Sequence, residues 1–225
     1  LITEKITYNK AKKLIMTYNN SELIMNDDYK VVSNNIFYNT LKNIIGSDEN
    51  SIFTDIDGNI VETNMFQYHS KKNLFSSIGN IKILDANKNK YYFKELHVDL
   101  KKREMIGSDA RVVLDQENFG LSKENDPRFV ANDIFISKDK TLLSKGVFTV
   151  CQQRDDKCPP WSLQAREIKH DKIKKTIYYD HATLKFYDIP IFYFPKFSHP
   201  DPTVKRQSGF LTPIFSNSTT TGAGF

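Results

Sequence analysis

Apolar and polar residues alternate through most of the chain, in short runs separated by polar turns. The clearest example is residues 161–195, where Ile168 and His170 alternate with charged neighbours before a polar turn at residues 171–176. The alternation then resumes at Ile177. An apolar side chain at every second position is typical of a strand with one buried face. The pattern therefore predicts a strand, a short turn and a second strand.

The same unit recurs along the chain. Its first strand begins, in successive copies, at Ile6, Ile36, Phe66, Leu96, Ile134 and Ile168. The first four copies are 30 residues apart, and the later steps are 38 and 34 residues. A unit this small cannot bury its own apolar face, so consecutive units must stack and share a core. Helical periodicity is nearly absent, and we predict an all-β fold of stacked two-strand repeats, a β-solenoid or β-jelly roll.

Stacking would direct the alternate apolar positions of every unit into one continuous interior. The ordinary interpretation is that these residues only pack a core. The functional interpretation is a groove that holds the acyl chains of a lipid, since an interior open at both ends can widen between the strands. The candidate groove residues are Ile36, Tyr38, Phe66, Tyr68, Leu96, Val98, Ile134, Ile136, Phe148, Leu184 and Phe186.

The repeats start at once, with no capping element before the first strand at residues 5–10. An uncapped strand offers unpaired backbone donors and acceptors to a strand of another protein. We therefore expect Ile6, Thr7 and Tyr8 to form a partner edge.

Prolines change the pattern after Asp188, in the segment IPIFYFPKFSHPDP. Because proline lacks a backbone donor and fixes φ, we expect the repeating sheet to stop there. Three glycines, Gly46, Gly107 and Gly146, precede the second strand of their repeats and suit a bend or bulge.

The composition fits a chain with a sizeable core, because 39% of its 225 residues are hydrophobic. No apolar run reaches the roughly 18 residues that a membrane helix needs. Because Leu1 is not an initiator, we expect the chain to be a fragment of a longer protein.

The chain carries a net charge of +5 and has a pI near 9.0. The excess lysines serve solvation, or they attract an acidic partner such as an anionic lipid headgroup or a nucleic acid. They occur in turns and on solvent faces, for example Lys12, Lys13, Lys71, Lys72, Lys101, Lys102, Lys174 and Lys175.

Residues that could support catalysis or bind a metal are dispersed. The five histidines lack the tight spacing of a zinc site, and phosphate loops, nucleophile elbows and HExxH are missing. We therefore expect no enzyme activity, no metal and no cofactor. Two alternatives to a lipid carrier stay open: a structural β-solenoid that mediates protein or carbohydrate contacts, and a polysaccharide-active enzyme with paired carboxylates in one cleft.

The two cysteines, Cys151 and Cys158, close the short polar loop CQQRDDKC. In an exported protein they could form a local disulfide, which would contribute about 2 kcal/mol through loop closure. Bridges to cysteines elsewhere and free thiols are the alternatives.

Several motifs in the last third of the chain occur in a recognisable order: VFTVC, CPPWSLQAREIKHD, ATLKFYDIPIFYFPKFSHPDP and KRQSGFLTP. In this order they resemble the LptD family of outer-membrane lipopolysaccharide-assembly proteins, also called organic solvent tolerance or OstA proteins. The resemblance is strong over about residues 147–215. The earlier repeats resemble the OstA-type β-jelly roll in pattern more than in residues.

The resemblance implies a periplasmic β-jelly roll at residues 1–188, a proline-rich linker at 189–208 and the first strand of a truncated outer-membrane β-barrel at 209–225. It implies that lipopolysaccharide passes from an LptA-like periplasmic bridge protein along the apolar interior. An LptE-like lipoprotein would bind the missing barrel, in the outer membrane of a Gram-negative bacterium. Nucleic acid is not an expected partner. The family also uses disulfides between the periplasmic domain and the barrel, whereas the proximity of Cys151 to Cys158 favours a local bond here.

Overall fold

The computed structural model describes residues 1–25, 29–115, 127–151, 160–200, 204, 216–218 and 222–224. Every regular element within these ranges is a β-strand, which confirms the predicted all-β class. No helix in the same ranges has the length and hydropathy of a membrane span. The strands form one long, unclosed antiparallel sheet and a separate hairpin.

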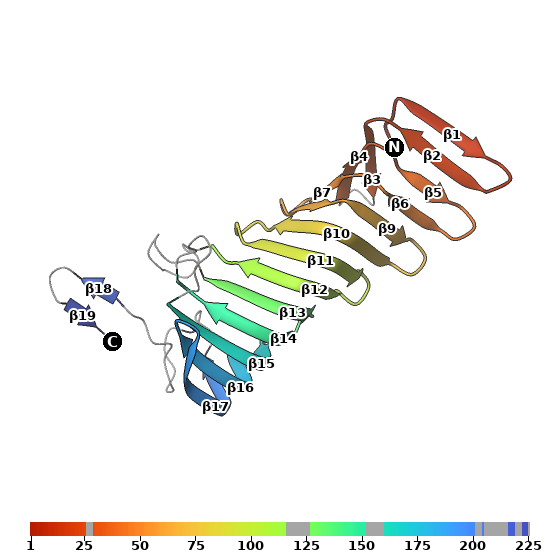
Figure 1. The fold of residues 1–225 in the computed structure, drawn as a ribbon. Coiled ribbons are helices and arrows are strands. Elements are labelled where there is room, and N and C mark those ends of the chain that lie inside the picture. The colour runs from red at the N-terminus through yellow and green to blue at the C-terminus, as the bar shows by residue number, and fades with distance from the viewer. Residues whose placement is uncertain are drawn as a thin grey trace.

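The amino-terminal part of the sheet consists of short strands. They are β1 (Lys5–Asn9), β2 (Leu14–Tyr18), β3 (Ser21–Met25), β4 (Tyr29–Ser33), β5 (Phe37–Asn39), β6 (Ile44–Ser47), β7 (Ser51–Asp55), β8 (Ile60–Thr63) and β9 (Met65–His69). Longer strands follow, and Figure 1 shows them stacked side by side. They are β10 (Leu74–Leu84), β11 (Lys90–Asp99), β12 (Glu104–Val113), β13 (Arg128–Ile136), β14 (Lys140–Thr149), β15 (Trp161–Asp171), β16 (Thr176–Phe186) and β17 (Ile189–Pro200).

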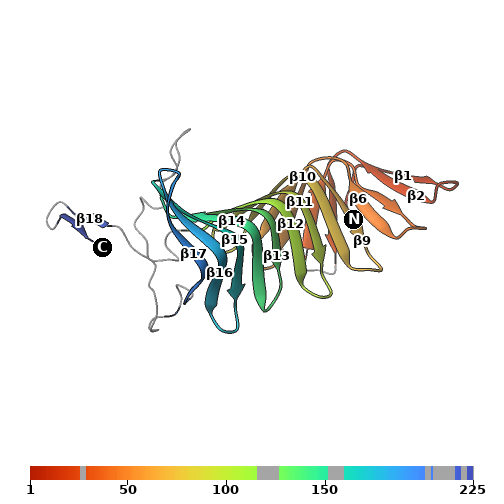
Figure 2. The same cartoon turned by 60° about the horizontal axis from the view of Figure 1, so that its bottom comes forward.

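Each long strand crosses two half-sheets. The first residues of β10 pair with β9 and its last residues pair with β8, so β8 and β9 together occupy the place of one long strand. In the same way, β2 with β3, β4 with β5, and β6 with β7 act as interrupted long strands. We call the part built on β1, β2, β5, β6 and β9 the first half-sheet, and the part built on β3, β4, β7 and β8 the second. Figure 2 shows the long strands curving from one half to the other.

The 30-residue repeat therefore differs in detail from the predicted pair of strands. Each repeat runs across both half-sheets and back, as four short strands in the amino-terminal part and as two long bent strands later. Of the six predicted strand starts, Ile6, Phe66, Leu96, Ile134 and Ile168 lie within strands, although none is a first residue and the last three lie well inside long strands, and Ile36 lies one residue before β5. Consecutive long strands from β10 to β17 pair antiparallel, so these repeats stack without crossovers.

The bends do not lie at the predicted glycines. Positive φ angles mark the corners instead, at Gly79 (113°), Asp109 (48°), Lys145 (51°) and His181 (49°). A residue in this conformation bends the strand, and Asp109, Lys145 and His181 are each skipped in the paired register while their neighbours stay paired. Gly107 has another role: a Cβ built there would lie 2.6 Å from the ring of Phe93, so its missing side chain makes room for that ring.

The prediction that the sheet stops at Asp188 is wrong. Ile189–Pro200 form β17, which pairs with β16 from Phe186 back to Thr176. The prolines are tolerated because β17 is an edge strand, and Pro195 stands at the corner, outside the register of paired residues. The ladder thus extends 12 residues beyond the predicted boundary.

The short strands β18 (Ser216–Ser218) and β19 (Gly222–Gly224) pair with each other. They lie apart from the long sheet in both views (Figures 1 and 2). They fall in the region predicted to begin a barrel, but residues 209–215 lie outside the described residues. The barrel strand stays a prediction.

The core lies between the half-sheets, along the line of corners. Its largest cluster joins buried residues of both halves: Leu96, Ile134, Leu143, Ile168 and Tyr179 from the first, and Ile81, Phe93, Ala110, Ala131, Ala165 and Ala182 from the second. Small alanines in the second half-sheet leave room for the large side chains of the first. A second cluster of Val31, Phe53 and Phe66 continues the core toward the amino terminus.

Hydroxyl groups replace apolar side chains beside the corners of the first repeats. The buried hydroxyls of Ser33 and Ser47 lie 2.8 Å apart, and Ser51 donates to Ser33 over 3.0 Å. Ser33 and Ser51 belong to the second half-sheet and Ser47 to the first, so these bonds join the halves. We call this set the hydroxyl seam; it consists of Thr3, Thr17, Ser21, Ser33, Ser47, Ser51, Thr63 and Ser77.

Candidate functional site

The predicted groove residues of the first half-sheet fall into two rows. In an antiparallel sheet, paired residues point to the same face, so the register identifies each row. The row beside the corner contains Ile36, Phe66, Leu96 and Ile134, whose side chains are at most 5% exposed. These four residues are core residues, as the ordinary interpretation expected.

The second row lies nearer the turns and is mostly half-buried, with Tyr8 exposed at one end and His199 buried at the other. Tyr38, Tyr68, Val98 and Ile136 belong to it, and the pairing brings them into one line with residues that the sequence analysis missed. The complete row is Tyr8, Ile15, Tyr38, Ile45, Tyr68, Phe75, Val98, Met105, Ile136, Thr141, His170, Ile177 and His199. The missed members lie mainly on the second strand of each hairpin. The alternation there predicted a buried face, but the cross-strand register did not follow from the sequence.

A matching apolar row runs along the second half-sheet. Phe148 and Leu184 belong to it, joined through Leu163, and both are half-buried. Its members are Leu23, Val31, Phe53, Val61, Ile83, Tyr91, Val112, Phe129, Phe148, Leu163, Leu184 and Phe192. The rings of Phe129 and Phe148 stack at 4.6 Å, so part of the row is already filled by aromatic packing.

Phe186 lies apart from this row. It pairs with Trp161 and Ile189 at the carboxyl-terminal end of the sheet and is 46% exposed. Its partner on β17, Ile189, is also exposed, as is Ile191 on the same strand. The structure therefore places Phe186 on an exposed apolar edge and not between the half-sheets.

The rows nearer the turns contain no Asp, Glu, Lys or Arg in either half-sheet. Apart from tyrosines, the polar members Thr141, His170 and His199 lie toward the carboxyl-terminal end, where His199 Nε2 lies 3.0 Å from the hydroxyl of Tyr179 in the neighbouring row. Burial raises the pKa of Tyr179, so the phenol stays protonated and can donate this bond. Burial is also the main cause of the raised pKa of Tyr91, whose hydroxyl donates to Asp85 over 2.9 Å. The rows that face the interior are therefore largely apolar and carry no Asp, Glu, Lys or Arg.

The predicted partner edge is exposed. All residues of β1 are exposed, with Ile6 at 56% and Tyr8 at 54%. β1 pairs with β2 on one side, and Figure 1 shows it at the end of the stack. Within the described part of the chain, no strand pairs with the other side of β1. Thr7 stands at the middle of this edge.

Of the two cysteines in the predicted local disulfide, Cys151 lies among the described residues and Cys158 lies outside them. Cys151 forms no disulfide with any described residue, and its thiol lies 3.8 Å from the carbonyl oxygen of Trp161. The local disulfide stays a prediction. No group of three metal-ligating side chains occurs among the residues that the structure describes.

Comparison with known proteins gives several relatives of one kind. LPS-assembly protein LptD of Pasteurella multocida is 29% identical over 125 residues, which cover 53% of this chain and 16% of that protein. LptD of Nitrosomonas europaea is 28% identical over 171 residues, covering 64% of this chain and 22% of that protein. LptD of Shewanella denitrificans is 38% identical over 86 residues, covering 38% and 11%. No protein-family model matches the chain.

The chain spans less than a quarter of the length of these curated relatives. All three relatives carry the name LptD, the family that the motifs in the last third of the sequence resemble. The comparisons confirm that this chain is similar to the LptD family of LPS-assembly proteins.

Proposed function

We propose that this chain carries lipopolysaccharide toward the outer membrane by holding its acyl chains between the two half-sheets. The observation that carries the proposal is the pair of uncharged, mainly apolar rows that run the length of an unclosed sheet. Moving an acyl chain from water onto such a surface contributes about 0.8 kcal/mol per CH₂ group. The role needs no bond chemistry and no cofactor, and the names of the relatives support it.

The proposal assigns the residues of the rows to different tasks. The buried residues hold the sheet together, including Val31, Phe53 and Val112 of the second half-sheet's row, and the half-buried residues of both rows contact lipid. Tyr38, Tyr68, Val98 and Ile136 are the lipid-facing residues of the first half-sheet, and Phe148 and Leu184 those of the second. Phe186 would contact acyl chains only as they leave the sheet at its carboxyl-terminal edge.

A photo-crosslinking scan tests this function. A photoreactive amino acid at positions of the half-buried row should form adducts with lipopolysaccharide, because these side chains face the interior. The same group at the next residue of the same strands should form few, because those side chains face outward. The interior set is Tyr68, Val98, Ile136 and Ile177, and the outward set is Gln67, His97, Phe135 and Tyr178. Adducts with protein alone at both sets would instead support the structural β-solenoid.

We further propose that β1 pairs with the last strand of an LptA-like periplasmic bridge protein and that the lipid passes from that protein to this chain at the paired strands. Replacing Thr7 by proline should weaken that docking about tenfold, because proline removes a backbone donor and distorts the exposed edge. Binding of the bridge protein to the purified chain measures the effect, and circular dichroism checks the fold. The matched control is Ser198→Pro on β17, the opposite edge strand, which should leave docking unchanged. Equal binding by all three proteins would contradict docking at β1.

The remaining assignments follow from the resemblance. We propose a periplasmic jelly roll whose ladder continues to Pro200, followed by a linker and the first strand of an outer-membrane barrel. The barrel would bind an LptE-like lipoprotein. The whole protein would reside in the outer membrane of a Gram-negative bacterium.

A further inference from the structure

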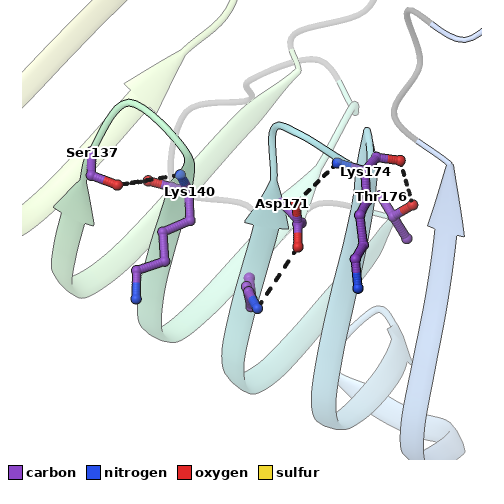
Figure 3. A network of polar contacts seen from close by, with 6 residues as sticks. Ser137, Lys140, Asp171, Lys174 and Thr176 are labelled. Atoms are coloured by element: carbon purple, nitrogen blue, oxygen red, sulfur yellow. Dashed lines mark hydrogen bonds and ion pairs between the residues drawn. The ribbon is translucent and has the colours of Figure 1, made fainter.

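The turns of the first half-sheet repeat the same lysine at the same place. Lys12, Lys42, Lys72 and Lys102 are 30 residues apart, and each is exposed. The backbone N–H of Lys12, Lys42 and Lys102 donates to the side chain that ends the preceding strand, at 2.9–3.0 Å. Figure 3 shows the same bond between Lys174 and Asp171 in a later repeat. These lysines therefore occupy one structural position.

Hydrogen bonds between successive turns align this position into a column. The N–H of Thr40 donates to the carbonyl of Lys13 over 3.0 Å, and Leu100 donates to Asn73 over 2.9 Å. Each repeat adds two strands, so equivalent lysines are about 10 Å apart. The turn segments also carry further basic residues, and we call the set the basic rim: residues 10–13, 40–43, 70–73, 100–103, 137–140 and 172–175. Asp139 is the one acidic residue within these segments, and Asp99 and Asp171 end the strands before two of them; Asp99 Oδ2 lies 3.9 Å from Lys102 Nζ.

The opposite rim carries the opposite charge. The described turns of the second half-sheet, with the strand residues that flank them, contain Asp55, Asp57, Asp85, Asp115 and Asp188, against Lys88 in one turn and Lys90 directly after it. Lysines placed only for solvation would be spread over both rims. The recurrence of the lysine at one turn position in all four amino-terminal repeats, on one rim only, is what points to a binding role.

The spacing of the lysines suits a row of separate anion contacts. At about 0.15 M ionic strength the Debye length is roughly 8 Å, so lysines about 10 Å apart are largely screened from one another and each attracts mainly an anionic group close to it. The half-buried apolar row lies close by: Tyr38 precedes the turn at residues 40–43 by two positions, or about 7 Å. An anionic group attached to an acyl chain lying on this row would fall within reach of the lysines.

We propose that the basic rim binds the phosphate groups of the transported lipid's headgroup while the acyl chains lie between the half-sheets. This inference rests on the proposed function and adds a recognition site for the polar end of the same molecule. The ligand is a phosphorylated amphiphile whose apolar and anionic parts contact two adjacent lines of the same half-sheet.

A charge-reversal variant of the chain tests the proposal. Lys42→Glu, Lys72→Glu and Lys102→Glu together should weaken binding of bisphosphorylated lipid A about tenfold at roughly 0.15 M salt, since each exposed ion pair contributes little alone. Binding of the same lipid without its phosphates should not change. The matched control combines Lys94→Glu, Lys145→Glu and Lys196→Glu, which make the same change in net charge away from the rim. The control should bind both lipids as the wild type does.

Other results would overturn the proposal in distinguishable ways. Equal losses in the rim and control variants would mean that only net charge matters. An equal loss for both lipids would mean that the rim variant damages acyl binding and not phosphate recognition. Loss of binding only to vesicles of phosphatidylcholine and phosphatidylglycerol would make the rim a membrane-surface patch. If neither lipid binds the wild-type chain, the proposed function falls together with this site.

Discussion

Replacing Phe66 by alanine is expected to lower the free energy of unfolding by about 3–5 kcal/mol. Phe66 is 1% exposed and joins the half-sheets, because its ring meets the edge of Phe53 at 4.7 Å and stacks on Phe75 at 6.1 Å. The substitution removes both ring contacts and leaves a cavity in a core only a few side chains wide. Urea unfolding followed by circular dichroism measures the change.

Phe192→Ala is the matched control for this experiment. Phe192 is 58% exposed on the edge strand β17, so the same truncation there should cost less than about 1 kcal/mol. Similar losses at the two positions would contradict the assignment of Phe66 to the core. An unchanged stability of Phe66→Ala would mean that the half-sheets are held together elsewhere.

Replacing Ile136 by aspartate is expected to reduce lipopolysaccharide binding more than tenfold while the chain stays folded. Ile136 is half-buried, packs against the main cluster and lies in a row without charged residues. In the lipid-free chain the carboxylate can stay hydrated at the open side of the sheet. A bound acyl chain would cover it, and burying an unpaired charge costs several kcal/mol.

The control is Val130→Asp on the same strand. Val130 is 48% exposed and pairs with Arg111 in the line of outward-facing residues, so a carboxylate there stays in water. Photo-crosslinking yield with lipopolysaccharide measures binding, and circular dichroism verifies folding of both variants. If Ile136→Asp folds and binds as well as Val130→Asp, acyl chains do not lie on this row.

The period and the inward-facing positions could be predicted from sequence because both are local. A 30-residue repeat is visible in single residues such as Phe66 and Leu96, and alternation alone places them on one face. The division of the row into buried and half-buried lines depends on distance from the corner. That distance is a property of the stacked sheet, and Tyr68 shows no local signal that separates it from Phe66.

The positions of the corners and the presence of β17 could not be predicted from the sequence for a different reason. Asp109, Lys145 and His181 adopt positive φ at the bends, although glycine is the residue that sequence rules favour there. Neighbouring strands impose this conformation, so the residue itself does not reveal it. The prolines of β17 were interpreted as the end of the sheet, because the sequence does not show that this strand forms an edge.

The hydroxyl seam has a consequence for folding. Repeats of equal length can pair with the wrong neighbour, a slip of one whole unit that preserves every inward-facing position. The seam makes the units unequal: Ser51 and Thr63 are followed, 30 residues later, by Ile81 and Phe93. In a chain that slipped by one repeat, a serine hydroxyl would be buried against these apolar side chains and would lose its hydrogen-bond partner. The change from hydroxyl to hydrocarbon side chains thus specifies which repeats pair with each other in the stack.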